Sequence, residues 1–222
     1  MKALITYLEQ YALLSLEKRE KLSALIGEHT LDLDLDTGLV RFSGGFEFPF
    51  QVLGTESHNT LTWLWAWAEE QAEVPPDLLE SARQMKEWGS LNRIPECTMP
   101  SVDLNRADGL LFSLIASEVC QAGCFYEDSY DGGALFLLLF GQTIEMQAPL
   151  DAAGLERQLL HLASSYDLNH RNALLSYLRA KELLFSEEGP LVSARLASGE
   201  ELRAEFDADG AVKTINGAGF ES

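Results

Sequence analysis

Three of the four tryptophans of the chain lie two residues apart within residues 59–68, and this spacing constrains the fold most strongly. Alternate side chains of a β-strand share a face, so Trp63, Trp65 and Trp67 would point the same way. The positions between them are also largely apolar. A strand that is apolar on both faces is typical of a sheet interior with a layer packed on each side. A helix is the alternative, but Trp and Thr are mediocre helix formers.

A helix and a hairpin are predicted before this strand. Apolar residues recur at helical spacing over residues 4–26, where Ser15 is a candidate break because Ser favours helix ends. Leu and Asp then alternate over residues 31–36, and Asp36-Thr37-Gly38 is typical of a hairpin turn. We therefore expect a strand with Leu on the inner face and Asp on the outer face.

A further strand over residues 46–53 contains Pro49. Because proline cannot donate a ladder hydrogen bond, this strand lies at an edge or its regular pairing ends there. Residues 54–59 would link it to the tryptophan strand. Consecutive strands with short connections predict an antiparallel meander.

The remainder of the chain carries the same two kinds of element. Helices are predicted over residues 78–88, 110–119, 152–165 and 168–184, a hairpin around Asp131-Gly132-Gly133, a loop over 89–106, and three short strands or a small meander over 191–215. The fold class is therefore α+β, an antiparallel sheet of meanders with helices packed on it.

The order of helix, strands and helix occurs in both halves of the chain. We predict a single α+β unit over residues 1–222, with possible similar halves 1–90 and 106–185 and a small C-terminal β meander over 190–216.

The charge balance is strongly acidic, with 35 Asp and Glu against 16 Lys and Arg and a net charge of −19. Such a surface repels phosphate backbones and anionic lipid, so we expect neither nucleic acid nor a membrane as partner. It suits a basic protein partner. Solubility alone is the alternative explanation of the charge.

The cysteines Cys97, Cys120 and Cys124 are odd in number and lack a disulfide-framework spacing, which favours a reducing compartment. The first ten residues lack a signal-peptide core, and the longest apolar run, 134–140, is far shorter than the ~20 residues of a membrane span. We therefore predict a cytoplasmic protein. Cys120 and Cys124 could contribute to a zinc site, but buried structural thiols are the favoured interpretation.

Known catalytic patterns are missing from the sequence. There is no Gly-x-Ser-x-Gly, P-loop, Gly-x-Gly-x-x-Gly or His-Glu-x-x-His. The alternating aspartates begin like a calcium loop, but Thr37 and Ser43 occupy the positions that require Gly and Glu. We predict no catalytic residue, no metal site and no cofactor.

Four residues remain as candidates for binding a ligand or a partner. Trp63, Trp65 and Trp67 could line a groove, because indole offers a large apolar area and one donor. His58 lies in the turn before them and would titrate near neutrality. The alternative, which burial statistics favour, is that the tryptophans are core residues.

Three segments resemble a family of uncharacterised bacterial proteins. They are Asp34 to Phe42, with an Asp-x-x-x-Gly-x-x-x-Phe hairpin, Gln51-Val52-Leu53-Gly54, and Thr62 to Ala68, with Trp-x-Trp-x-Trp-Ala. The resemblance continues through Phe125-Tyr126 to Phe140. The family usually has an Asn where this chain has Glu69. Because the family is a domain of unknown function, the resemblance implies a soluble bacterial protein and no particular activity.

Three hypotheses of function follow. The first is a non-enzymatic acidic protein that binds a basic protein partner, with an immunity- or antitoxin-like role as one version. The second is a small-ligand-binding or hydrolytic domain with its site beside Trp63, Trp65 or Trp67 and near His58. The third is a structural domain within an assembly, for which the sequence leaves the oligomeric state open.

Overall fold

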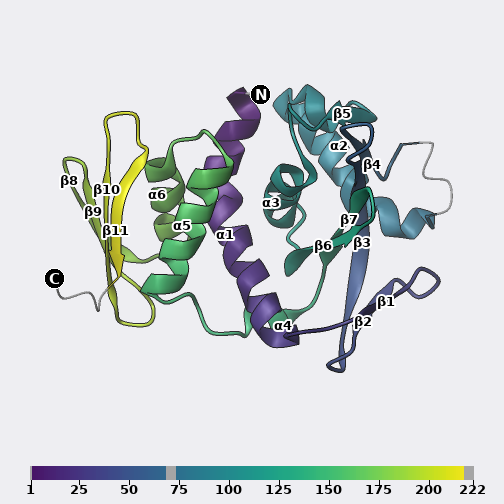
Figure 1. Cartoon of the computed structure of the whole chain (residues 1–222), viewed down its shortest axis with the longest axis horizontal. Coiled ribbons are helices and arrows are strands. Elements are labelled where there is room, and N and C mark those ends of the chain that lie inside the picture. The colour runs from purple at the N-terminus through teal and green to yellow at the C-terminus, as the bar shows by residue number, and fades with distance from the viewer. Residues whose placement is uncertain (1, 69–73, 218–222) are drawn as a thin grey trace. The chain divides into compact units, whose positions relative to one another are not determined.

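Helices and antiparallel strands make up the computed structural model, which describes residues 2–68 and 74–217 (Figure 1). The chain folds into two compact units, and we describe each by itself. The first unit comprises Met1–Leu4 and Lys18–Gln147, and the second comprises Ile5–Glu17 and Ala148–Ser222. The predicted halves 1–90 and 106–185 stay a prediction. The α+β class predicted from the sequence is confirmed.

Helix α1 (Lys2–Ile26) contributes residues to both units. Its residues Leu4, Leu8 and Ala12, each four apart, are fully buried. This spacing places them on one face of the helix, as the sequence predicts. Ser15 is buried inside the helix and does not break it, so the predicted interruption is wrong.

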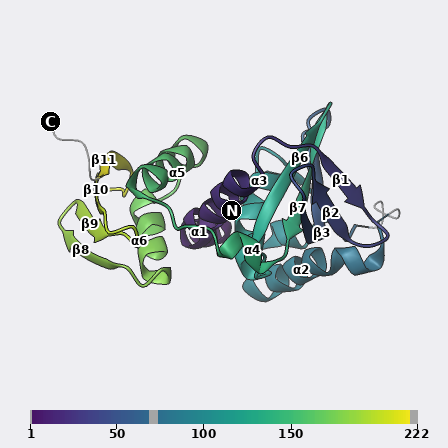
Figure 2. The same cartoon turned by 90° about the horizontal axis from the view of Figure 1, so that it is seen from below.

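The first unit contains a seven-stranded antiparallel sheet. Its strands are β1 (Leu31–Asp34), β2 (Leu39–Phe42), β3 (Phe46–Ser57), β4 (Thr62–Trp65), β5 (Ser101–Asp103), β6 (Cys124–Tyr130) and β7 (Gly133–Leu139). Strands β1 to β5 are neighbours in chain order, which confirms the predicted meander. Strand β7 pairs with β3 and with β6. Figures 1 and 2 both show the β1–β2 hairpin beside the first half of β3.

Strand β3 changes partner along its length. It pairs with β2 from Phe46 to Pro49 and with β7 from Phe50 onward. Pro49 therefore marks the end of one pairing, which was one of the two predicted outcomes. The predicted link over residues 54–59 is wrong, because β3 continues to Ser57. Gly54 lies inside the strand, where a Cβ atom would collide with the indole of Trp63.

A β-bulge at Leu53 divides β3 into two parts. Val52 pairs with Leu137, whereas Gly54 pairs with Phe136, so one residue of β3 has no counterpart in β7. Since neighbouring residues of β7 point to opposite faces, the residues of β3 after the bulge exchange faces relative to those before it. Both faces of the sheet therefore receive side chains from this one strand.

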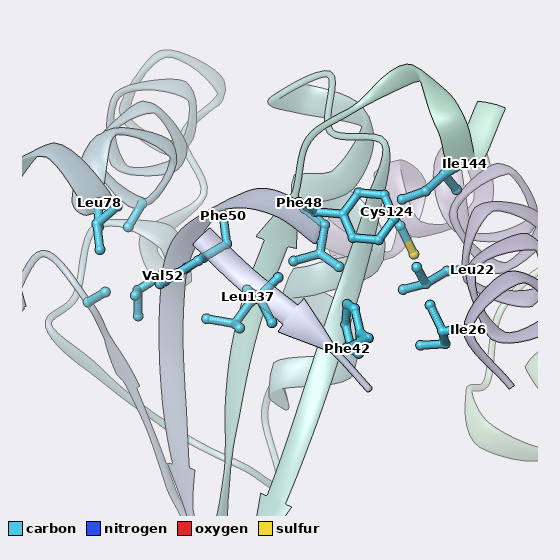
Figure 3. Packing of buried hydrophobic residues seen from close by; sticks show 14 of the residues in the cluster. Leu22, Ile26, Phe42, Phe48, Phe50, Val52, Leu78, Cys124, Leu137 and Ile144 are labelled. Carbon is cyan, nitrogen blue, oxygen red and sulfur yellow. The ribbon is translucent and has the colours of Figure 1, made fainter. Parts of the chain in front are cut away.

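One face of the sheet carries a large apolar cluster (Figure 3). It includes Phe48, Phe50 and Val52 of β3, Leu137 of β7, and Leu22 and Ile26 of α1. Burying a side chain of this kind stabilises the fold by about 1.5–3 kcal/mol. The cluster shows why the apolar positions of α1 beyond Lys18 belong to the first unit.

Four helical segments of the first unit follow β4, three of them before β5 and one after it. They are the 3-10 helices η2 (Pro76–Leu79) and η3 (Pro95–Cys97), and the α-helices α2 (Glu80–Asn92) and α3 (Gly109–Val119). The loop predicted over residues 89–106 is wrong in part, because it contains the end of α2, η3 and β5. Gly89 lies inside α2 and does not end it. A side chain at this position would collide with Cys97, which explains the glycine. The short helix α4 (Gln142–Glu145) is not predicted by the sequence pattern.

The second unit combines two further helices with a four-stranded sheet. The elements are α5 (Ala152–Ser165), α6 (His170–Ala180), β8 (Leu184–Glu188), β9 (Leu191–Arg195), β10 (Glu201–Phe206) and β11 (Val212–Gly217), with sheet order β11-β10-β9-β8. Asp151 and Asn169 cap the two helices by accepting hydrogen bonds from backbone N–H groups at 2.6 and 2.8 Å. The predicted meander is present, but it has a fourth strand, β8, where the sequence predicted the end of a helix.

Within the part of the chain that the structure describes, no helix combines the length and the apolar character that crossing a membrane requires.

Candidate functional site

Trp63 and Trp65 lie in the core on the side of the sheet that faces α3. Their rings meet edge to face with centroids 5.3 Å apart, and the Trp65 ring lies 4.7 Å from that of Phe112. Trp65 Nε1 donates a hydrogen bond to the carbonyl oxygen of Glu96 at 2.9 Å. Both side chains have no exposed surface, so neither lines a groove in this conformation. Strand β4 lies between β3 and β5, as expected for an interior strand.

Trp67 differs from the two other tryptophans of this segment. Strand β4 ends at Trp65, so the strand predicted to reach residue 68 is too long. Trp67 is partly buried, and the ammonium of Lys86 lies 3.8 Å from its ring centroid. A cation over an indole face is an attractive contact, which holds this ring in place. Glu69, where the resembling family has an Asn, lies outside the described residues.

His58 lies directly after β3 and is more than half exposed. Its Nε2 atom is 3.5 Å from Oε2 of Glu56, whose side chain is only 11% exposed. The other oxygen of Glu56 accepts a hydrogen bond from the N–H of Gly109, the first residue of α3. The N-terminus of a helix stabilises a negative charge, so this carboxylate is held in place beneath the imidazole.

Glu56 was not predicted as a site residue, although it pairs directly with Trp63 across β3 and β4. Continued alternation from Phe48 would have placed Glu56 on the opposite face, and the bulge at Leu53 reverses that assignment. Glu56 thus connects two of the predicted site residues, Trp63 and His58. The binding role of those residues stays a prediction.

A carboxylate that contacts a histidine can orient the ring for proton transfer. Covalent catalysis of hydrolysis would also need a side-chain nucleophile. The hydroxyls that follow His58 in the chain bond locally, with Thr60 Oγ1 and Thr62 Oγ1 2.6 Å apart. The arrangement supports binding of a polar group at His58 better than nucleophilic chemistry.

The cysteines are free and buried, as the favoured interpretation of the sequence expects. Burial raises the pKa of Cys97, Cys120 and Cys124 to about 12. The thiolate is the metal ligand and the nucleophile, so thiols that remain protonated are poor candidates for either role. Within the described residues, no group of three or more His, Cys, Asp or Glu side chains is placed to hold a metal ion.

Carboxylates gather on the outer face of the first three strands. Asp32 of β1, Arg41 of β2 and Glu47 of β3 stand directly opposite one another in register. Arg41 contacts Asp32 at 3.8 Å, Asp34 at 3.3 Å and Glu47 at 2.7 Å. We call these residues, together with the exposed Asp36, the acidic hairpin. The acidic hairpin therefore has one guanidinium for four carboxylates and keeps a negative charge.

Asp34 also builds the turn of this hairpin. Its Oδ1 accepts hydrogen bonds from the N–H groups of Asp36 and Thr37, each at 3.1 Å. Hydrogen bonds from the Thr37 side chain and backbone, and then the contact with Arg41, hold the pKa of Asp34 below its usual value. The carboxylate is therefore charged in the folded hairpin over a wider pH range.

The acidic hairpin lies at an edge of the sheet. Among the described residues, β1 pairs with β2 alone. The outer backbone groups of an edge strand can pair with an additional strand. Leu31 and Leu33 pack partly into the apolar cluster, so the alternate residues Asp32 and Asp34 face outward.

A family model described as "Family of unknown function (DUF6882)" matches residues 5–142. The match includes every strand of the seven-stranded sheet, the acidic hairpin, and the Glu56–His58 pair. Neither the search of curated proteins nor the search of solved structures found a match.

Proposed function

The chain belongs to DUF6882, a family of unknown function, and from this premise we propose that it is a non-enzymatic protein that binds a basic protein partner. The acidic hairpin is the proposed site of contact. An immunity- or antitoxin-like role, in which an acidic protein covers a basic one, is one version of this proposal.

The observation that carries the proposal is the unbalanced charge on an edge strand. Asp32 is 78% exposed and Glu47 is 49% exposed, and both rely on Arg41 for a counter-ion. A partner with Lys or Arg residues would supply the missing positive charge. Complementary charge of this kind steers encounter and selects the partner.

The backbone of β1 supports the same mode of binding. An extended segment can add to a sheet edge, where main-chain hydrogen bonds give affinity and alternate side chains give specificity. A segment that added to β1 would place every second side chain over the face that carries Asp32 and Asp34. We therefore expect a partner segment in which Lys or Arg alternates with other residues.

The test uses a synthetic peptide of alternating Lys and Thr, with an alternating Glu and Thr peptide as control. Calorimetric titration of the full chain should show binding of the lysine peptide and none of the glutamate peptide. The double variant Asp32→Asn with Asp36→Asn should weaken binding about tenfold, because it removes two of the hairpin charges. Hydrogen exchange should show new protection at Leu31–Asp34 when the peptide is bound.

The matched control is the double variant Glu188→Gln with Glu201→Gln, which removes the same charge from exposed positions in the second unit. Its affinity for the lysine peptide should stay near that of the unchanged protein. An equal loss of affinity in both double variants would show that net charge alone attracts the peptide, and it would contradict the proposal. Peptide binding without protection of β1 from hydrogen exchange would contradict it as well.

The contact between Glu56 and His58 favours a second candidate, a small-ligand site beside the tryptophan strand. A ligand there would hydrogen-bond the exposed imidazole while Glu56 holds the ring from below. Screening small polar fragments by NMR should move the His58 ring resonances, and Glu56→Gln should weaken the fragments that bind. A screen in which the His58 resonances stay fixed would remove this candidate.

A further inference from the structure

A hollow of about 230 Å³ lies between the end of α1 and the first residues of β6, within the first unit. Its walls combine one cation, Arg19, one carboxylate, Glu127, and the pair His29 and Tyr126 with apolar side chains. Ligand pockets for drug-sized molecules occupy about 300–1,000 Å³, so this hollow fits a smaller molecule.

Arg19 and Glu127, the two charged residues of the hollow, form a long and partly exposed ion pair. Arg19 Nη2 lies 3.5 Å from Glu127 Oε2, and the side chains are 41% and 29% exposed. Charge-assisted hydrogen bonds of this type are usually about 2.7–2.9 Å long. An exposed pair at longer distance stabilises the fold little, so a ligand can take over both partners at low cost. The Arg19 guanidinium is also positioned by the Phe125 ring, whose centroid lies 5.3 Å away.

The histidine and the tyrosine form a fixed polar wall. His29 Nδ1 lies 2.7 Å from the carbonyl oxygen of Gly27, which can only accept, so Nδ1 carries the proton. In the neutral ring Nε2 is then the acceptor, and the Tyr126 hydroxyl donates to it at 2.8 Å. The hydroxyl oxygen of Tyr126 keeps its lone pairs as acceptors for a further donor. Phe42 supports both rings, with centroids 5.0 Å from His29 and 5.3 Å from Tyr126.

The remaining wall is apolar. Leu22 and Ile26 line the hollow and are both nearly buried. Figure 3 shows them side by side on α1, close to Phe42. An aliphatic group placed against them would leave water and gain the stabilisation that accompanies burial of apolar surface.

We propose that this hollow binds a small zwitterion, an α-amino acid with an aliphatic side chain. Arg19 receives its carboxylate, Glu127 receives its ammonium, and Leu22 and Ile26 contact its side chain. The proposal goes beyond binding of a protein partner, and it concerns residues outside the acidic hairpin.

The experiment is a calorimetric titration of the full chain with L-leucine and with two truncated analogues. The analogue 4-methylpentanoate lacks the ammonium, and 3-methylbutylamine lacks the carboxylate. Leucine should bind. Each analogue should bind at least about tenfold more weakly than leucine, because one charged contact is missing. Binding only at concentrations where both analogues bind equally would overturn the proposal, as would no binding of leucine, isoleucine, valine and methionine.

The variants Arg19→Gln and Glu127→Gln separate the two contacts. Each variant should bind leucine about tenfold more weakly than the unchanged protein does. The Arg19→Gln protein should bind leucine and 3-methylbutylamine with similar affinity, because its contact with the carboxylate is lost. The control is Arg203→Gln, which removes one member of an exposed Arg–Glu pair in the second unit and should leave leucine binding unchanged. Circular dichroism confirms that each variant is folded. Unchanged affinity in folded Arg19→Gln and Glu127→Gln proteins would overturn the assignment.

Discussion

Strands β7 and β10 belong to antiparallel sheets, but they bury their residues differently. In β7 the consecutive residues from Phe136 to Leu139 are all buried. In β10 only alternate residues are buried, Leu202, Ala204 and Phe206, and Arg203 between them is exposed. The first pattern requires a packed layer on each face of the sheet, and the second requires a layer on one face only.

This difference indicates which strand positions of each unit tolerate a polar side chain. Helix α3 and the large apolar cluster occupy opposite sides of β7, so no position from Phe136 to Leu139 is available for a polar residue. Strand β10 keeps a solvated face that tolerates substitution. Exposed polar groups of the first sheet, such as those of the acidic hairpin and His58, therefore lie at its edges and strand ends.

The largest effect that we expect concerns the thiols, which all lie in the unit that contains β7. Because burial raises their pKa to about 12 and limits access, the three cysteines should react with a disulfide reagent at least about 1000-fold more slowly than in the unfolded chain. The measurement is the rate of thiol release at mildly alkaline pH, with and without denaturant. Fast reaction of any cysteine in the native protein would show that the first unit opens readily.

Substitutions on both faces of β7 test its double burial directly. Leu137→Ala and Leu138→Ala should each lower the free energy of unfolding by about 2–5 kcal/mol, since each leaves a cavity in a packed layer. Urea titration measures the change. Leu184→Ala in β8 is the matched control, because that side chain is 79% exposed. A small loss for either β7 variant would mean that its face is not packed.

The same comparison predicts that large and small losses of stability alternate along β10 when its residues are substituted. Arg203→Ala should change the free energy of unfolding by no more than about 0.5 kcal/mol, because Arg203 and its partner Glu201 are both mostly exposed. Leu202→Ala, one residue away, should cost about 2–5 kcal/mol. Similar losses for the two neighbours would contradict a solvated outer face.

The smallest expected effect is on the titration of the acidic hairpin. Asp34 should titrate in the native protein below the usual range of an aspartate, and Thr37→Val should move its pKa back upward. Because the folded-state pKa is lowered, its contribution to stability is present above the unfolded-state pKa and is lost as the pH falls through the folded-state value. NMR titration of the carboxylates measures the pKa of Asp34 in the unchanged protein and in the Thr37→Val variant. A midpoint that Thr37→Val leaves in place would exclude the turn as the cause.

Long periodic segments of the chain were predictable from the sequence. Helix α1, the hairpin at Asp36-Thr37-Gly38, the buried strand β7 and the C-terminal meander follow from apolar spacing and turn residues. Each of these patterns has one dominant structural solution. The burial of Trp63 and Trp65 follows from the apolar character of both faces of their strand.

Helix ends were less predictable because their usual signals were missing or misleading. Helix α2 ends at Asn92 and is followed by Arg93 with φ 57°, and the chain after α6 turns at Glu182 with φ 53°. Glycine is the residue that usually adopts this left-handed conformation, so neither position reads as a stop. Conversely, Gly89 reads as a stop but serves close packing against Cys97.

The candidate site was predictable only in part. His58 and the tryptophans stand out by residue type, but Glu56 was hidden because the bulge that aims it at α3 lies beside Gly54, where a link between strands was predicted. The hollow beside α1 was hidden for another reason. It brings Arg19 and His29 next to Tyr126 and Glu127, about a hundred positions later in the chain, and such long-range contacts arise only when the sheet forms.

The bulge at Leu53 makes the length of β3 as important as its composition. A regular strand in which Leu53 paired with Phe136 would send Glu56 towards the apolar cluster, and every later residue of β3 would meet the wrong partner in β4 and β7. Substitutions before or after Leu53 affect one contact each, whereas deletion of one residue between the bulge and Ser57 would exchange the inside and outside of the residues that follow it. Relatives that keep this architecture should therefore show no one-residue gap between Gly54 and Ser57, even where their residues differ.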